Sequence, residues 1–169
     1  MRRVLAIAVV LVAHAAHADR VWVPSVAAGI AVGGSSVADT PVIDNASYTA
    51  ASLAWEMRDH DGLTVAPEVA ALGVWHGRAT PLGLAGLRLD VAVAPTTTLS
   101  FGAHAGAADD RGGFHPAGDA SLALHAGARV QLGVELALTS WRATMMMGGD
   151  PMSASLMFAR LGITLSAPL

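Results

Sequence analysis

The chain has 169 residues, about the length of one domain, and a formal net charge of −3. Hydrophobic residues make up 53% of it and charged residues only 14%, against roughly 25% charged in an average soluble domain. Every basic residue is an arginine and no basic patch is present, so nucleic acid is not an expected partner. The chain has no cysteine, which disfavours a small disulfide-stapled scaffold, and its mean hydropathy of +0.51 leaves a membrane protein open.

Residues 1–18 are predicted to be a secretory signal peptide. Arg2 and Arg3 form a basic start, an apolar run covers residues 4–13, and Ala16-His17-Ala18 offers a small-x-small cleavage site. The alternative is a transmembrane helix, but spanning a bilayer needs about 20 apolar residues and this run is half as long. We therefore expect the rest of the chain to be exported. Any membrane segments in it are expected to be strands, because no later apolar run is long enough for a spanning helix.

The first half of the remaining chain predicts strands in which apolar and polar side chains alternate. Successive side chains of a strand point to opposite faces. Leu53 and Trp55, for example, fall on one face, while Ser52 and Glu56 fall on the other. The first three predicted strands cover residues 20–33, 47–58 and 63–75. Segments rich in turn residues predict a long polar loop, a tight turn and a further loop at residues 34–46, 59–62 and 76–81.

A hairpin in the middle of the chain has the clearest alternation. Leu87 and Leu89 lie on one face of its first arm and Arg88 and Asp90 on the other, and Pro95-Thr96-Thr97 suits the turn. The remaining predicted strands are the arms of this hairpin, 85–94 and 98–105, followed by 119–128, 132–139 and 157–165. Long loops are predicted at 108–118 and 144–151, and a short connection at 129–131.

Together these segments predict an all-β fold, an eight-stranded antiparallel up-and-down transmembrane β-barrel with short turns on one rim and longer loops on the other. The charged residues of the strands fall opposite the aliphatic face, away from lipid, where an Arg near the midplane would cost roughly 2–4 kcal/mol. This predicted lumenal polar network consists of Glu56, Arg58, Glu68, Arg88, Asp90, Glu135 and Arg160. Tryptophans near the predicted strand ends are expected at the membrane interface, and they are Trp22, Trp55, Trp75 and Trp141.

On this pattern, residues 19–169 resemble the small outer-membrane barrels of the OmpA/OmpX type along the whole mature chain. The resemblance implies a barrel domain in the bacterial outer membrane, with outer-membrane lipid and the outer-membrane assembly machinery as partners. The chain departs from the family at its C-terminus: such barrels commonly end in an aromatic residue that is read during assembly, whereas this chain ends in Leu169.

Other inward or loop residues are expected to be structural. A turn centred near residue 113 would place His104 opposite residue 121 or 123, too far from His125 for shared metal coordination. Asp109, Asp110 and Asp119 lack the spacing of a calcium loop and are expected to solvate the outer loop. We therefore expect no metal and no cofactor.

The predicted function is that of a non-enzymatic outer-membrane protein with a structural or adhesion-like role. Its lumen would be plugged by the ion-pair network, and a surface partner would bind through residues 34–46, 108–118 and 144–151. The main alternative is a soluble periplasmic or secreted β-barrel that binds a small apolar ligand, with its Leu/Val face turned inward. A narrow pore and a lipid-modifying enzyme are further alternatives, although the sequence has neither Gly-x-Ser-x-Gly nor His-x-Ser.

Overall fold

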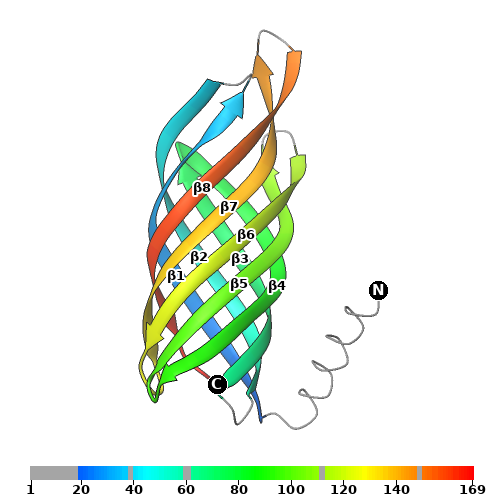
Figure 1. The fold of residues 1–169 in the computed structure, drawn as a ribbon. Helices are drawn as coiled ribbons and strands as arrows, with labels where there is room; N and C mark the ends of the chain where they lie inside the picture. The colour runs from blue at the N-terminus through cyan, green and yellow to red at the C-terminus, as the bar shows by residue number, and fades with distance from the viewer. Residues whose placement is uncertain (1–18, 38–39, 59–61, 111–112, 148–149) are drawn as a thin grey trace, which may run out of the picture.

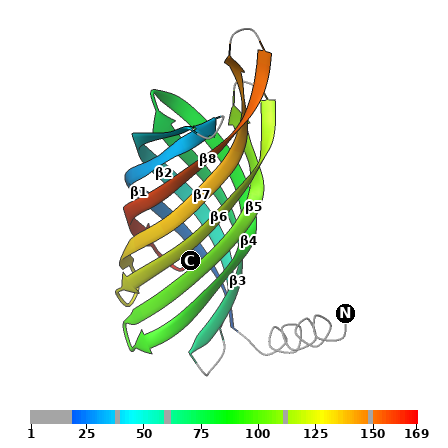
Figure 2. The same ribbon diagram turned by 45° about the horizontal axis from the view of Figure 1, so that its top comes forward.

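The computed structural model describes residues 19–37, 40–58, 62–110, 113–147 and 150–169. Antiparallel strands follow one another in sequence order around a closed barrel, and the eighth pairs with the first (Figures 1 and 2). They are β1 Asp19–Val37, β2 Thr40–Arg58, β3 Leu63–His76, β4 Arg78–Ala94, β5 Thr97–Asp110, β6 Gly113–Ala126, β7 Gln131–Met147 and β8 Asp150–Ser166. The predicted all-β, eight-stranded antiparallel up-and-down barrel is confirmed. Within the described ranges, no helix has the length and apolar character to cross a membrane.

Residues 1–18 lie outside the described residues, and the signal peptide stays a prediction. The barrel begins at Asp19, and its C-terminal segment runs back along β1, where the Leu169 N–H donates to the Trp22 carbonyl at 2.8 Å. Both ends of the described chain therefore lie at the same end of the barrel, which we name the terminal rim.

The terminal rim also carries the connections β2–β3, β4–β5 and β6–β7. The predicted turn after β4 is confirmed, because Ala94 pairs with Thr97 across Pro95 and Thr96. A backbone bond joins two neighbouring turns, with the Gly127 N–H donating to the Thr96 carbonyl at 2.9 Å. The other four connections lie at the opposite end, the distal rim, at residues 38–39, Gly77, 111–112 and 148–149.

The long loops predicted for the distal rim are wrong, because strands cover most of those residues. The β1–β2 ladder continues through Gly33↔Asp44 to Val37↔Thr40, and Gly77 alone joins β3 to β4. Gly77 has a φ of 65°, a left-handed conformation that glycine adopts without steric cost. The mispredicted loops are 34–46, 76–81, 108–118 and 144–151. Turn-favouring residues remain extended there because the paired arm of each hairpin supplies the ladder, and this outweighs their local preference.

The strands project unequally at the distal rim. In Figures 1 and 2, the β7–β8 hairpin reaches farthest from the terminal rim. The β2–β3 register reaches only Ser47↔Trp75, while β2 continues to Thr40 along β1. Neighbouring hairpins therefore separate at this rim, whereas the body of the barrel is paired all the way around.

The two faces of the sheet have opposite chemistry. The aliphatic residues point outward, and Ile30, Leu136 and Ile163 are 60%, 55% and 61% exposed. The residues between them point inward, where Glu68 and Arg160 are 8% and 3% exposed. The predicted alternation of faces is thus present, with the charged face inside.

Candidate functional site: the interior of the barrel

Arg88 on β4 gathers three carboxylates inside the barrel. Its Nη2 donates to Glu56 Oε1 at 2.6 Å, and its Nε lies 3.0 Å from both carboxylate oxygens of Asp90. Glu68 on β3 is farther away, with its Oε1 3.7 Å from Arg88 Nη1. The bonds to Glu56 and Asp90 join a guanidinium to a carboxylate, the strongest class of protein hydrogen bond, and the Glu68 contact is a longer ion pair. We name these four residues the Arg88 cluster.

Arg160 on β8 forms the second charged group. Its Nη2 donates to Asp119 Oδ1 at 2.6 Å, its Nε donates to Thr139 Oγ1 at 2.6 Å, and its Nη1 lies 3.2 Å from Glu135 Oε1. The Thr139 hydroxyl in turn donates to Asp119 Oδ1 at 2.6 Å. The guanidinium carbon lies 4.6 Å from the centre of the Tyr48 ring, so an aromatic face packs against the same cation. We name this set the Arg160 cluster.

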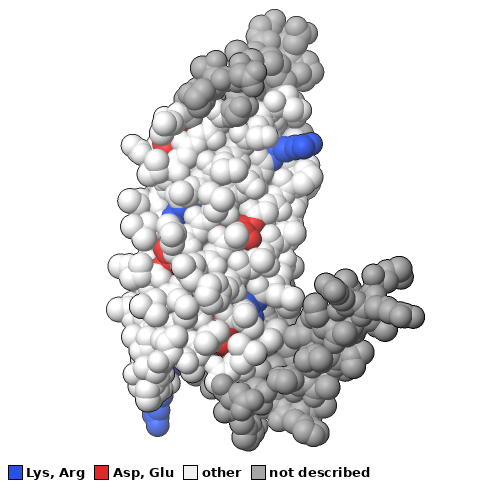
Figure 3. All heavy atoms as spheres, viewed as in Figure 1, with Lys and Arg blue, Asp and Glu red and all other residues white. Residues whose placement is uncertain are grey.

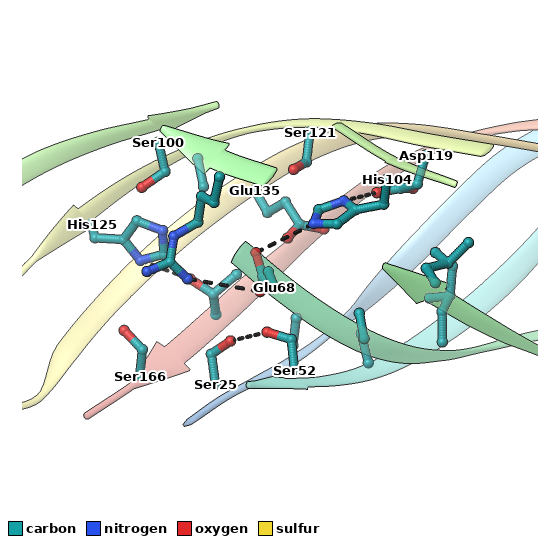
Figure 4. Close-up of a pocket in the computed structure, with 18 of the residues that line it drawn as sticks. Ser25, Ser52, Glu68, Ser100, His104, Asp119, Ser121, His125, Glu135 and Ser166 are labelled. Carbon is teal, nitrogen blue, oxygen red and sulfur yellow. Dashed lines mark hydrogen bonds and ion pairs between the residues drawn. The ribbon is translucent and has the colours of Figure 1, made fainter. Parts of the chain in front are cut away.

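His104 on β5 connects the two clusters (Figure 4). Its Nε2 lies 3.3 Å from Glu68 Oε2 and its Nδ1 lies 3.7 Å from Asp119 Oδ2. The register explains this position, because His104 is directly opposite Asp119 in the β5–β6 ladder. A continuous chain of charged groups therefore crosses the interior.

Carboxylates outnumber guanidiniums in the described interior. Because each arginine contacts more than one carboxylate and the carboxylates are more numerous, the interior has an excess of formal negative charge. The carboxylates are Glu56, Glu68, Asp90, Asp119 and Glu135, against the guanidiniums of Arg88 and Arg160.

A cavity of about 80 Å³ lies beside this chain of charges. A water needs at least ~10–15 Å³ and two or more polar partners, so the cavity has the room and the polarity for several waters. The Ser25 and Ser52 hydroxyls lie 2.5 Å apart on its wall, and His125 Nδ1 lies 3.2 Å from Thr164 Oγ1. Figure 4 shows these side chains converging on the interior from all around the barrel, and further hydroxyls come from Ser100, Ser121 and Ser166.

Glycines make room for the large inward side chains. A Cβ at Gly162 would meet the Tyr48 hydroxyl, and one at Gly133 would lie 2.6 Å from both His125 Nδ1 and Thr164 Oγ1. In a narrow barrel, an inward residue without a side chain leaves space for a large one on the next strand. Tyr48 can therefore cover Arg160 only because residue 162 is glycine.

An apolar group of inward side chains lies on the distal side of the charged clusters. Trp141 and Phe158 stack with ring centroids 5.3 Å apart, and both are buried beside leucine and valine side chains of β3 and β4. We name this group the apolar cluster. Its buried members are Ala31, Ala46, Tyr48, Leu72, Val74, Leu82, Leu84, Ala108, Ala117, Trp141, Ala143 and Phe158.

The structure places most of the predicted network residues inside the barrel and divides them into two groups. Glu56, Glu68, Arg88 and Asp90 form the Arg88 cluster, whereas Glu135 and Arg160 contact each other farther round the sheet. The side chain of Arg58 lies outside the described residues.

Two inward residues were assigned wrongly from the sequence. Asp119 is a buried ligand of Arg160 and does not solvate a loop, because β6 already begins at Gly113. Trp141 is 5% exposed, so it packs in the interior and is not an interface residue. Both have the inward parity of their strands, and this was the signal available in the sequence.

The remaining predicted interface tryptophans lie on the outside of the barrel. Trp22 and Trp55 stack 5.9 Å apart outside the barrel near the terminal rim, and Trp75 is 50% exposed near the distal rim.

The predicted partner of His104, residue 121 or 123, is wrong by a few residues, because the β5–β6 connection is centred earlier than residue 113. Among the described residues, no group of three or more His, Asp or Glu side chains is arranged to hold a metal ion.

Solved structures with a similar fold are bacterial and designed membrane barrels. Neisserial surface protein A has 13% sequence identity, with 86% of this chain and 97% of that chain aligned and a TM-score of 0.49. OmpT, an outer membrane protein of Vibrio cholerae, has 12% identity over 86% of this chain and 52% of its own, with a TM-score of 0.36. A de novo designed transmembrane β-barrel has 12% identity, coverage of 86% and 95%, and a TM-score of 0.36. At these values the likeness carries no functional information.

No protein-family model matches the chain, and no curated protein matches it in sequence.

Proposed function

We propose that this chain is an outer-membrane β-barrel protein of a diderm bacterium, with a non-enzymatic structural or surface-interaction role. The observation that carries the proposal is the reversed distribution of polarity. Outward side chains such as Val134 and Leu165 are 57% and 45% exposed, while charged residues of the strand interiors such as Glu68 and Arg160 are buried inside. A soluble domain rarely exposes a continuous apolar belt, because apolar surface is costly in water, whereas lipid is the solvent that suits it.

The ends of the belt support a membrane location. Trp22 and Trp55 near one rim and Trp75 near the other have the positions of interface tryptophans, with an apolar ring and a polar N–H. Arg20 lies over the Trp55 ring at 5.4 Å, which would place a cation at headgroup level. The face in Figure 3 is mostly white; red and blue atoms show only as small patches between the white side chains in its middle, and the blue atoms that protrude from it lie toward the two ends.

The same distribution argues against the soluble alternative. A soluble barrel that binds an apolar ligand needs its Leu/Val face inside, whereas the interior here contains charged clusters and serines. The lipid-enzyme alternative needs a histidine that activates a serine, but His104 contacts two carboxylates and His125 contacts Thr164. Ion pairs and apolar side chains line the interior, which supports a closed barrel over an open pore. Its expected partners are outer-membrane lipid and the assembly machinery.

The surface role would belong to the distal rim. The strands of the barrel are 14 to 19 residues long over their full length, whereas about 9–11 residues suffice for a transmembrane strand. The excess length at 34–46, 108–118 and 144–151 would project from the membrane as paired strands and offer a partner a surface of extended hairpins.

The test is the location and topology of the protein in a diderm host. We expect fractionation with outer membranes and heat-modifiable migration on gels, and recovery in a detergent-free soluble fraction would refute the proposal. An epitope inserted at Gly77, on the distal rim, should be detected on intact cells. The same epitope at Thr96, on the terminal rim, should be detected only after the outer membrane is opened.

A further inference from the structure

The interior of the barrel changes character along its axis. On β3, Glu68 lies toward the terminal rim and Leu72 and Val74 toward the distal rim. On β4 the order along the axis is the same, with Arg88 and Asp90 toward the terminal rim and Leu82 and Leu84 toward the distal rim. The same division recurs on β7 and β8. On these strands a polar layer of inward side chains therefore lies toward the terminal rim and an apolar layer lies next to it toward the distal rim, with polar residues such as Thr80 again beyond it.

The cavity belongs to the polar layer. Its walls extend from Ser25, Gln131 and Ser166 near the terminal rim to Leu72 and Leu84, which belong to the apolar cluster. Serine hydroxyls and charged groups hold water well, so this layer suits the waters that the cavity can hold. Arg88 and Arg160 are part of the cavity wall, so their ion pairs leave this space beside them unfilled.

The apolar layer has the opposite property. Leu72 and Leu82 are 3% exposed and Val74 and Phe158 are 1% exposed, and these side chains pack against one another in one apolar cluster. A narrow apolar constriction excludes water and ions because its walls offer no hydrogen bonds to replace those of the hydration shell.

We infer that the apolar cluster, not the ion-pair network, is the barrier to permeation, and that the polar layer is a blind, water-filled vestibule open at the terminal rim. The inference rests on the proposed membrane location. It deepens the proposed closed barrel by assigning the closure to Trp141, Phe158 and the side chains packed around them.

Cysteine accessibility tests the vestibule directly, because the chain has no cysteine of its own. Ser52→Cys would place a thiol in the polar layer. Ser35→Cys would place one beyond Ala31 of the apolar cluster, on the inward face of β1 near the distal rim. In vesicles with one barrel orientation, a membrane-impermeant thiol reagent should label the two variants from opposite sides, each at least about tenfold more slowly from its unfavoured side. Labelling of Ser52→Cys from both sides, or from neither, would overturn the inference.

Removing the barrier tests the assignment to the apolar cluster. In the Trp141→Ala/Phe158→Ala background, Ser52→Cys should become reactive from both sides, and planar bilayers should record new conductance. The matched control is Arg88→Gln, which breaks ion pairs but leaves the apolar cluster intact, and it should stay closed. Conductance in the control, or continued one-sided labelling in the double variant, would overturn the assignment. If the double variant does not fold, the labelling of Ser52→Cys and Ser35→Cys in the otherwise unchanged barrel decides alone whether the interior is closed between these two positions.

These outcomes are distinct from a failure of the proposed function. A chain that neither inserts into vesicles nor shows heat-modifiable migration would refute the membrane location. A chain that inserts but labels at both cysteines from the same side would leave that location standing and refute only the blind vestibule.

Discussion

Leu136→Arg is the sharpest single test of which solvent faces the outer surface. Leu136 lies on the outward face of β7, paired with Leu122 on β6 and with Leu161 on β8. Its neighbours on that face of β7, from Leu132 to Leu138, are all apolar. If this face meets lipid, an Arg near the midplane costs roughly 2–4 kcal/mol of unfolding free energy. At about 1.4 kcal/mol per factor of ten, the folded-to-unfolded ratio would fall roughly 30- to 700-fold. If the face met water, a surface substitution would change the unfolding free energy by only about 0.5 kcal/mol.

The measurement is denaturant unfolding of the refolded barrel in lipid vesicles, followed by tryptophan fluorescence. Val130→Arg is the matched control, because Val130 is 57% exposed but lies in the β6–β7 connection at the terminal rim. An Arg near the interface costs only about 0–1 kcal/mol. Equal midpoints for the two variants would refute the assignment of the outer face to lipid.

The other predictions concern the interior. Arg160→Met should lower the unfolding free energy by roughly 3–5 kcal/mol because it leaves buried carboxylates unpaired. The control is Arg78→Met, which breaks an ion pair in which the Arg78 side chain is 40% exposed and should cost less than about 1 kcal/mol. If the two variants lost equal unfolding free energy in denaturant, burial would not be the cause of the larger loss at Arg160. Gly162→Ala should cost roughly 1–3 kcal/mol, because its Cβ would clash with the Tyr48 side chain and lie 2.6 Å from the Ala28 carbonyl oxygen. In a Tyr48→Ala background the same substitution should cost less, and an equal cost would exclude Tyr48 as the cause. Ser52→Cys should react faster with a cationic than with an anionic thiol reagent of equal size, because carboxylates outnumber guanidiniums inside, and equal rates at low salt would contradict this.

The strands and their faces could be predicted because they depend only on a period of two. Leu87 and Leu89 against Arg88 and Asp90 fix one face as apolar and the other as charged, whatever lies on neighbouring strands. The same parity places Trp141 with Glu135 inside the barrel. The error there came from judging Trp141 by its nearness to a strand end.

Strand ends and contacts could not be predicted in this way, because they depend on the register between strands. Moving the centre of a hairpin by one residue moves the partner of every residue in it by two. His104 therefore meets Asp119 and not residue 121 or 123. Residues such as Gly33 and Pro41 favour turns locally, but they stay extended because the opposite arm of the hairpin pairs with them.

The layered interior is recorded in the sequence as a local loss of alternation. From Ala70 to Trp75, β3 is uniformly apolar apart from one glycine, so its period of two disappears there. A strand with lipid on one side and a polar lumen on the other must alternate, whereas a strand with lipid outside and apolar packing inside need not. Leu72 and Val74, which broke the pattern, are thus the inward residues of the apolar cluster. The non-alternating residues 70–75 mark the height at which the apolar cluster closes the barrel. The part of β3 around Glu68 marks the height of the hydrated polar layer.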